Sequence, residues 1–206
     1  MNTTNPLLRP NDADDAEDLH APRIHAQILS AVVDVATSFG ISRLSVGDVA
    51  RRAGLSRQTL YRHFPSKDEL VAHAVVQETA VLIDQVLAAT RLHADPQMAV
   101  QAGLETALRA TRAHPLLDRL LRTEPEALLP LVTQQGGPVM NHVRRAVTTI
   151  FAERYPGTDP VRLHLAADSA TRLLISYAVS APDESPEVIA RFLASALTQA
   201  LGAPLA

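Results

Sequence analysis

Side chains between residues 57 and 64 have the types and spacing to recognise DNA bases. A glutamine can form paired hydrogen bonds with adenine, and an arginine with guanine, in the major groove. On a helix, Gln58 and Arg62 share one side, and the apolar Leu60 and Phe64 share the opposite side. This pattern predicts a short helix that packs inward through its apolar side and faces DNA with its polar side. The flanking side chains, which could reach further bases or the phosphate backbone, are Arg57, Thr59, Tyr61 and His63.

The residues around this stretch predict the elements that would position it. Ser45 and Asp48 form a capping box at the start of a preceding helix. Gly54 can end that helix in the left-handed conformation, Ser56 can cap the next helix, and Pro65 ends it. Two short helices joined by a glycine turn form a helix-turn-helix, whose second helix enters the major groove. The alternative is a solvated helix that carries these polar residues by chance, but the turn and both caps favour DNA binding.

The stretch from Ile24 to Val75, about a quarter of the chain, closely resembles the DNA-binding domain of TetR-family transcriptional repressors. The matching residues are Phe39-Gly40, Asp48-Val49-Ala50, Ala53-Gly54-Leu55-Ser56, Thr59-Leu60-Tyr61, His63-Phe64 and Lys67-Asp68-Glu69-Leu70. The resemblance implies DNA contacts from Ser45, Arg57, Thr59, Tyr61, His63 and Lys67. Two positions depart from the family pattern. Val46 replaces a frequent hydroxyl residue, which puts a phosphate contact in doubt, and Gln58 replaces a frequent glycine or alanine, which could add a base contact.

The distribution of charge supports a DNA partner. The chain has a net charge of −3, yet residues 21–70 carry seven basic and four acidic side chains. Phosphate attraction requires a local positive excess rather than a basic whole chain. Residues 1–20 carry one basic and five acidic side chains together with Pro6 and Pro10, which predicts a disordered acidic tail.

Helical signals continue through the rest of the chain. Besides the two short helices, we expect helices at about residues 22–39, 66–92, 95–114, 115–123, 124–133, 138–155, 159–180 and 185–201. No segment alternates like a strand. The sequence therefore predicts an all-α protein with a three-helix DNA-binding domain at residues 21–70, its motif at about 45–64. A helical effector-binding and dimerisation domain would follow at residues 71–206.

The last two predicted helices, at about residues 160–180 and 186–201, carry apolar residues on more than one face. One face can pack on the core of the chain, and the other needs a partner. A second copy that contributes the same two helices would form a four-helix dimer interface, as in TetR relatives. A core helix in a monomer is the alternative.

The middle of the chain would hold an effector pocket if the resemblance extends that far. Its apolar candidates are Leu104, Leu108, Leu116, Leu117, Leu120, Leu121, Leu128, Leu131, Val139 and Val143. Its polar candidates are Arg119, Arg122, Asn141, His142, Arg145 and Tyr177. Core packing explains the first set equally well, and surface ion pairing explains most of the second. The composition favours a lipophilic or acyl-type small molecule.

Other classes of function find no support in the sequence. HExxH, GxSxG and Walker motifs are absent, and the histidines lack metal-ligand spacing, so we expect no catalytic residue, metal site or cofactor. The chain has no cysteine, no signal peptide and no apolar run of about 20 residues, so we expect a cytoplasmic protein without a membrane partner, at the nucleoid when bound to DNA.

The leading hypothesis is a ligand-responsive repressor that binds a palindromic double-stranded operator as a homodimer and is released by a small lipophilic effector. Two alternatives remain open from the sequence. One is a helical small-molecule-binding protein or enzyme whose N-terminal helices do not bind DNA. The other is an activator on the same fold.

Overall fold

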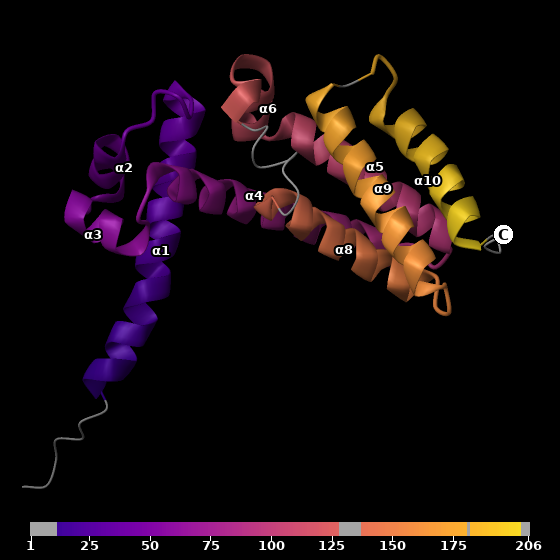
Figure 1. Ribbon diagram of the computed structural model, residues 1–206, viewed down its shortest axis with the longest axis horizontal. Helices are drawn as coiled ribbons and strands as arrows, with labels where there is room; N and C mark the ends of the chain where they lie inside the picture. Colours follow the sequence, from indigo (N-terminus) through magenta and orange to yellow (C-terminus); the bar gives the residue numbers. More distant parts are fainter. Residues whose placement is uncertain (1–11, 128–136, 181, 203–206) are drawn as a thin grey trace, which may run out of the picture.

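The computed structural model describes residues 12–127, 137–180 and 182–202 (Figure 1). Every regular element within these ranges is a helix, which confirms the predicted all-α class. The helices are α1 (Asp12–Phe39), α2 (Val46–Ala53), α3 (Arg57–His63), α4 (Lys67–Arg91), α5 (Pro96–Ala113), α6 (Pro115–Thr123), α8 (Pro138–Arg154), α9 (Pro160–Val179) and α10 (Pro186–Gly202). The helix expected at residues 124–133 falls largely outside the described residues.

Short polar side chains set the starts of five helices. Ser45, Ser56, Ser66, Asp95 and Asp159 each accept a hydrogen bond from a backbone N–H in the first turn that follows. These groups would otherwise lack a partner within the helix, and such a cap stabilises a helix by about 1 kcal/mol. The structure therefore confirms the helix starts that the capping residues predict.

The start of α1 differs from the prediction. The helix begins at Asp12 rather than near Pro22, so residues 12–21 extend it towards the N-terminus. Three aspartates fall within the first four residues of the helix, where negative charge is favourable because of the helix dipole. Residues 1–11 lie outside the described residues.

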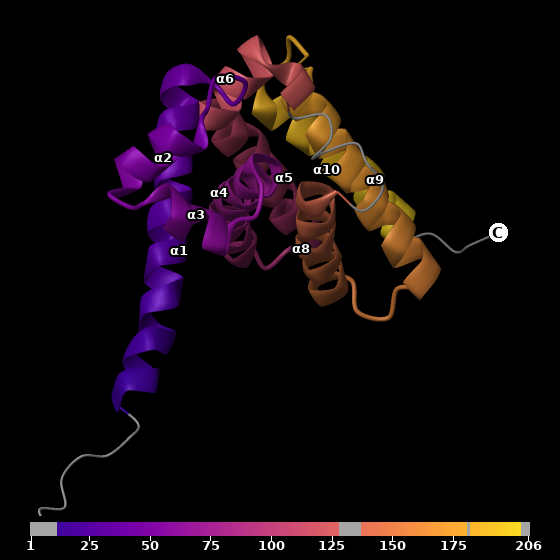
Figure 2. The same cartoon turned by 60° about the vertical axis from the view of Figure 1, so that its left-hand side comes forward.

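The helices form two groups that α4 connects (Figures 1 and 2). The first three helices and the start of α4 surround one apolar core, which includes Ile28, Val49, Leu60 and Phe64. A second core lies between α5, α8, α9 and α10. Leu116 and Leu120 of α6 belong to the first core, so this helix of the second group packs directly on the DNA-binding end.

The connecting helix α4 is also the only described helix that is long and apolar enough to cross a membrane, judged by length and composition alone. Its main neighbours are α1, α5 and α8. Leu70, Val71, Ala74 and Val75 are buried in the first core. These contacts identify α4 as a core helix whose hydropathy serves packing on both sides.

Candidate DNA-binding surface and effector cavity

The turn between α2 and α3 has the geometry that the sequence predicts. The hydroxyl of Ser45 accepts the backbone N–H of Asp48 at 3.1 Å, and the hydroxyl of Ser56 accepts that of Thr59 at 3.0 Å. Gly54 adopts φ 65° and ψ 28°, a left-handed conformation that a residue without Cβ adopts at little cost. Its N–H and that of Leu55 close the end of α2.

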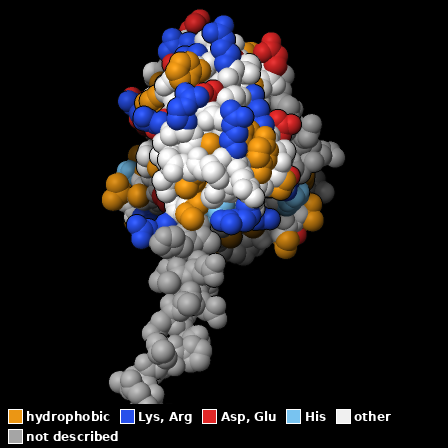
Figure 3. All heavy atoms as spheres, turned by 90° about the vertical axis from the view of Figure 1, so that its left-hand side faces the viewer, with side chains coloured by type: hydrophobic (Ala, Val, Ile, Leu, Met, Phe, Trp, Pro, Cys, Tyr) orange, Lys and Arg blue, Asp and Glu red, His pale blue; other side chains and the backbone are white. Residues whose placement is uncertain are grey.

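The recognition helix α3 separates apolar from polar side chains as expected. Leu60 is 1% exposed and Phe64, just beyond the helix, is 2% exposed, and both join the first core with Val49 and Ala53. The outward residues that are exposed are Arg57, Gln58, Tyr61 and Arg62. Thr59 is half-buried. Figure 3 views this end of the molecule, where basic side chains are scattered over much of the face.

Two arginines of α2 are engaged within the domain rather than free for DNA. Arg51 pairs with Asp48 at 2.7 Å, and Arg52 pairs with Asp34 of α1 at 2.7 Å. The hydrogen bond from the Ser45 hydroxyl, and the charge of Arg51, hold the pKa of the Asp48 carboxyl below its usual value. Asp48 thus stays ionised and keeps the start of α2 capped, which fixes the position of Ser45.

The structure places His63 differently from the other candidates. Its Nε2 atom is buried and has no hydrogen-bond partner among the described residues. The neighbouring Phe64 belongs to a ring cluster, in which His25 lies tilted against Phe64 with ring centroids 4.6 Å apart and His73 meets both rings edge-on. Burial, and then the neighbouring His73 and His63, lower the pKa of His25. A phosphate contact through Nε2 of His63 would require the side chain to turn outward.

Lys67, the first residue of α4, has a partner in the turn between α1 and α2. Its ammonium donates to the carbonyl oxygen of Ser42 at 3.4 Å. The carboxylate of Glu124, beyond the end of α6, accepts both the backbone N–H and the hydroxyl of Ser42, at 2.8 and 2.9 Å. Sequence reasoning missed Ser42 and Glu124, because 82 positions separate the two residues and no local pattern links them.

A cavity of about 140 Å³ lies between α4, α5, α6, α8 and α9. Two threonines, Thr79 and Thr111, contribute the hydroxyl groups among its described lining residues, and none of those residues is charged. The hydroxyl of Thr79 already donates to the carbonyl oxygen of Val75 at 2.7 Å. The largest apolar side chains of the wall include Leu82, Ile83, Leu108, Leu117, Leu121, Ile150, Leu174 and Ile175.

Of the residues that the sequence suggested for an effector pocket, several apolar ones line this cavity. Those that line it are Leu108, Leu117, Leu121, Val139 and Val143. Leu104, Leu116 and Leu120 are buried in the two cores instead. Leu128 and Leu131 fall outside the described residues.

None of the six polar candidates lines this cavity. Arg122 pairs with Asp118 at 2.7 Å, Arg144 donates to Asn141 at 2.8 Å, and Tyr177 packs against the second core. The other three, Arg119, His142 and Arg145, likewise lie elsewhere on α6 and α8. The inward faces of these helices carry Leu117, Leu121, Val139, Val143, Ala146, Val147 and Ile150. The five candidates on α6 and α8 fall on the remaining faces of those helices, and Tyr177 lies on α9, so none of the six borders this cavity.

A capped helix-turn-helix with an exposed polar recognition helix, followed by a helical domain, defines a DNA-binding transcription regulator. Residues 28–74 match the family described as "Bacterial regulatory proteins, tetR family". Residues 95–199 match the "Bacterial Tetracyclin repressor, C-terminal domain". The chain therefore belongs to the TetR family of transcriptional regulators, which are not enzymes. As such a regulator it acts in the cytoplasm.

Known relatives align over most of the chain. It is 28% identical to the HTH-type transcriptional regulator AlkX of Mycobacterium tuberculosis, over 83% of this chain and 82% of the relative. EthR of Mycolicibacterium smegmatis is also 28% identical, over 84% and 82%. Among solved structures, AlkX from Dietzia sp. superposes with a TM-score of 0.71 at 24% identity, covering 86% of this chain and 94% of that one. RolR in complex with resorcinol gives a TM-score of 0.62 at 14% identity, over 90% of both chains.

Proposed function

We propose that this TetR-family regulator is a repressor that binds a palindromic operator as a homodimer and is released by a neutral, lipophilic effector. On this proposal the DNA contacts come from Ser45, Arg57, Gln58, Thr59, Tyr61, Arg62, His63 and Lys67. The protein would sit at the nucleoid while it is bound to its operator. The observation that carries the effector class is the cavity, whose described wall is apolar apart from two threonine hydroxyls.

The chemistry of the wall favours an uncharged effector. Moving a carboxylate from water into such a site is costly unless a partner neutralises it. The hydroxyl of Thr79 already donates its hydrogen bond to the carbonyl oxygen of Val75. No described lining residue supplies a positive charge. A cavity near 140 Å³ is similar in size to one that admits a benzene-sized molecule. A longer chain would fit only if side chains of the wall moved.

The solved structures offer two chemistries to compare. The Dietzia AlkX is a repressor implicated in the biodegradation of n-alkanes, and RolR was crystallised with resorcinol. An alkane or alcohol and a small phenol are both uncharged near neutral pH. Both classes are consistent with the wall described here, whereas a fatty acid or acyl-CoA thioester would bring an ionised group.

The dimer is supported by exposed apolar side chains on the last two helices. Val161, Leu165 and Leu173 of α9 are 62%, 56% and 36% exposed. Val188 and Phe192 of α10 are 42% and 69% exposed. Water contact with such a surface is unfavourable, and a second copy of the same pair of helices would cover it symmetrically. Two recognition helices would then meet two half-sites of a palindrome.

A selection from random DNA, followed by gel shifts with the selected site, tests operator binding. A palindromic consensus bound in a salt-sensitive manner would support the proposal, and binding without sequence preference would refute it. A reporter gene placed behind the site should be more active when the regulator gene is deleted. Lower activity on deletion would make the protein an activator.

Matched pairs of ligands test the effector class. We expect 1-octanol and small phenols to raise the melting temperature and to weaken operator binding at pH 7.5. Octanoate, which has the same chain length and a charge, should bind at least tenfold more weakly. Equal or tighter binding of octanoate would contradict a neutral effector and would point to a charged group that enters from outside the described wall.

A further inference from the structure

The turn between α1 and α2 is held by a carboxylate from the other group of helices. Glu124 follows α6 directly, and its Oε2 atom accepts the backbone N–H of Ser42 at 2.8 Å and the Ser42 hydroxyl at 2.9 Å. Ser42 also contacts Lys67, because the Ser42 carbonyl oxygen accepts a hydrogen bond from the Lys67 ammonium at 3.4 Å. Ser42 therefore joins the end of α6 to a residue that family resemblance places on the DNA phosphates.

The backbone of the turn is shaped to admit this carboxylate. Gly40 ends α1 with φ 87°, where its N–H bonds to the carbonyl oxygen of Ala36 at 2.8 Å. A Cβ atom at Gly40 would overlap the carboxylate of Glu124. Glycine at this position thus serves two purposes: it permits the left-handed conformation, and it leaves room for a side chain from α6.

The charge of Glu124 is stabilised where it lies. Partial burial acts to raise its pKa, but hydrogen bonds from the Ser42 backbone, the Ser42 hydroxyl and the Ile41 backbone outweigh burial and hold the pKa below its ordinary value. The carboxylate is therefore ionised at neutral pH. Hydrogen bonds to a charged acceptor are stronger than those between neutral groups.

The helix that ends at Glu124 also forms part of the cavity wall. Leu117 and Leu121 of α6 line the cavity, whereas Leu116 and Leu120 pack in the core of the DNA-binding end. At the start of α6, the His114 ring lies 2.8 Å from the carboxylate of Glu78 on α4. An effector that displaces α6 would thus move a helix that is tethered at both ends, and one tether is the α1–α2 turn.

From these contacts we propose that Glu124 is a positioning residue for DNA binding. It holds residues 40–44 in one conformation and so fixes the start of α2, with Ser45, and the side chain of Lys67. It does this from the helix that borders the cavity. Without this anchor the turn would have to become ordered when DNA binds, and that ordering lowers affinity. The operator-binding part of this proposal rests on the family assignment alone and needs no effector.

The test compares Glu124→Ala with Glu126→Ala in the full-length protein. Glu126 is an exposed residue of the same type two positions further on, which makes it a matched control. On a site selected from random DNA, we expect Glu124→Ala to raise the Kd about tenfold and Glu126→Ala to leave it unchanged. Hydrogen exchange of the Ile41 and Ser42 amides should become faster in Glu124→Ala only. Glu124→Gln, which keeps the length and one acceptor oxygen, should restore part of both properties.

If Glu124 only stabilised the fold, these measurements would give a different result. General destabilisation would lower the melting temperature and the fraction of active protein, but the active fraction would keep its Kd and the exchange increase would spread over both cores. That result would overturn the proposal. A Glu124→Ala protein with the same Kd and the same hydrogen-exchange rates as wild type would also overturn it. A selection that yields no specific site would instead refute the repressor proposal, and the exchange experiment would still decide whether Glu124 holds the turn.

Discussion

Gln58 and Lys67 belong to the same predicted DNA surface, but their chemistry predicts different contributions. Gln58 is exposed on the outer face of α3, where its amide can pair with a base edge. Gln58→Ala should weaken binding to the selected site by about 1–3 kcal/mol and relax preference at one base position. Lys67→Ala, in contrast, should weaken binding to all sequences alike and reduce the slope of log Kd against log salt by about one.

Gel shifts on the selected site and on single-base variants, at several salt concentrations, separate these two outcomes. Equal losses on every sequence for Gln58→Ala would show that this residue does not read a base. An unchanged salt slope for Lys67→Ala would show that its ammonium remains with Ser42 when DNA is bound.

The lowered pKa of Glu124 predicts a pH dependence of stability. A carboxyl whose pKa is lower in the folded than in the unfolded chain stabilises the fold above its unfolded value, near 4.5, and this contribution disappears as pH falls through the folded value. At pH 7, Glu124→Gln should therefore lower the free energy of unfolding by about 1–2 kcal/mol. The difference from wild type should shrink as pH falls below about 4.5. Urea unfolding from pH 7 to 3.5 measures it, and a difference that stays constant would contradict the assignment.

Residues that act through local geometry could be predicted from the sequence, whereas those that act across the fold could not. Ser45 and Ser56 each accept the backbone N–H of the residue three positions further on, so their roles follow from spacing alone. Glu124 lies 82 positions from Ser42, and an acidic residue after a short helix gives no sign of its partner. The buried position of His63 Nε2 was also not predictable, because it depends on how α1 and α4 pack around Phe64.

At the scale of helices, the cavity depends on which face each helix turns inward. On α8, Val139, Val143, Ala146 and Ile150 recur at helical spacing and line the cavity. Two of these residues, Val139 and Val143, were among the apolar candidates from the sequence. The polar candidates on α6 and α8 were chosen for their chemistry instead, and the structure places them on other faces. Helix bounds were predicted well where caps and prolines mark them, and less well at α1, whose start at Asp12 was not predicted.

Filling the cavity should separate effector binding from DNA binding. Ala146 lines the cavity on α8, so Ala146→Leu places apolar atoms where an effector would lie. We expect effector affinity to fall at least about tenfold, or 1.4 kcal/mol. Operator affinity should stay unchanged, and the protein should no longer be released by the effector. The change in melting temperature should be small, because added apolar contacts offset local crowding.

Ala152→Leu provides the control for this prediction. Ala152 lies on the same helix and is exposed, so the same substitution there adds a side chain without entering the cavity. Thermal shifts and gel shifts with 1-octanol or a small phenol compare the two variants. If Ala146→Leu still responds to the ligand like Ala152→Leu, the effector binds elsewhere.

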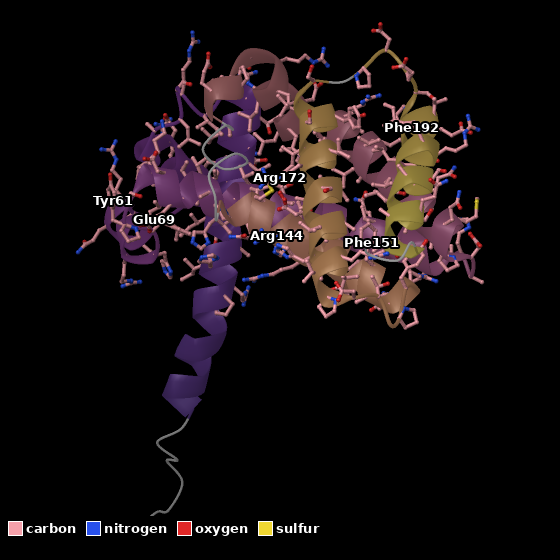
Figure 4. All side chains as sticks on the ribbon, turned by 45° about the vertical axis from the view of Figure 1, so that its right-hand side comes forward. Tyr61, Glu69, Arg144, Phe151, Arg172 and Phe192 are labelled. Atoms are coloured by element: carbon pink, nitrogen blue, oxygen red, sulfur yellow. The ribbon has the colours of Figure 1, made fainter. Side chains whose placement is uncertain are left out.

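Over the whole molecule, the proposed DNA-binding and dimerisation surfaces lie at opposite ends. Figure 4 shows Tyr61 of α3 at one end and Phe192 of α10 at the other. The α4 helix runs between the two groups of helices (Figure 1). The distance between two recognition helices in a dimer would therefore depend on α4 and α6 as well as on the interface. Half-sites lie about 34 Å or a multiple apart. An effector shifts this equilibrium only if it binds the DNA-incompetent arrangement more tightly.

The proposed dimer interface can be tested at Phe192. Phe192 is 69% exposed near the middle of α10, and in the proposed interface it would be covered by the partner. Phe192→Glu would bury a charge there, so we expect a monomer in sedimentation velocity experiments. Loss of the second DNA-binding domain should weaken binding to the palindrome at least about hundredfold while a single half-site is bound as before.

Leu92→Glu is the matched control for Phe192→Glu. Leu92 is 83% exposed at the end of α4 and belongs to neither of the last two helices, so its substitution should leave the mass and the operator affinity unchanged. A dimeric Phe192→Glu with normal operator affinity would place the interface on another face. The exposed apolar residues of α9 and α10 would then need a different partner, because contact between such an apolar surface and water is unfavourable.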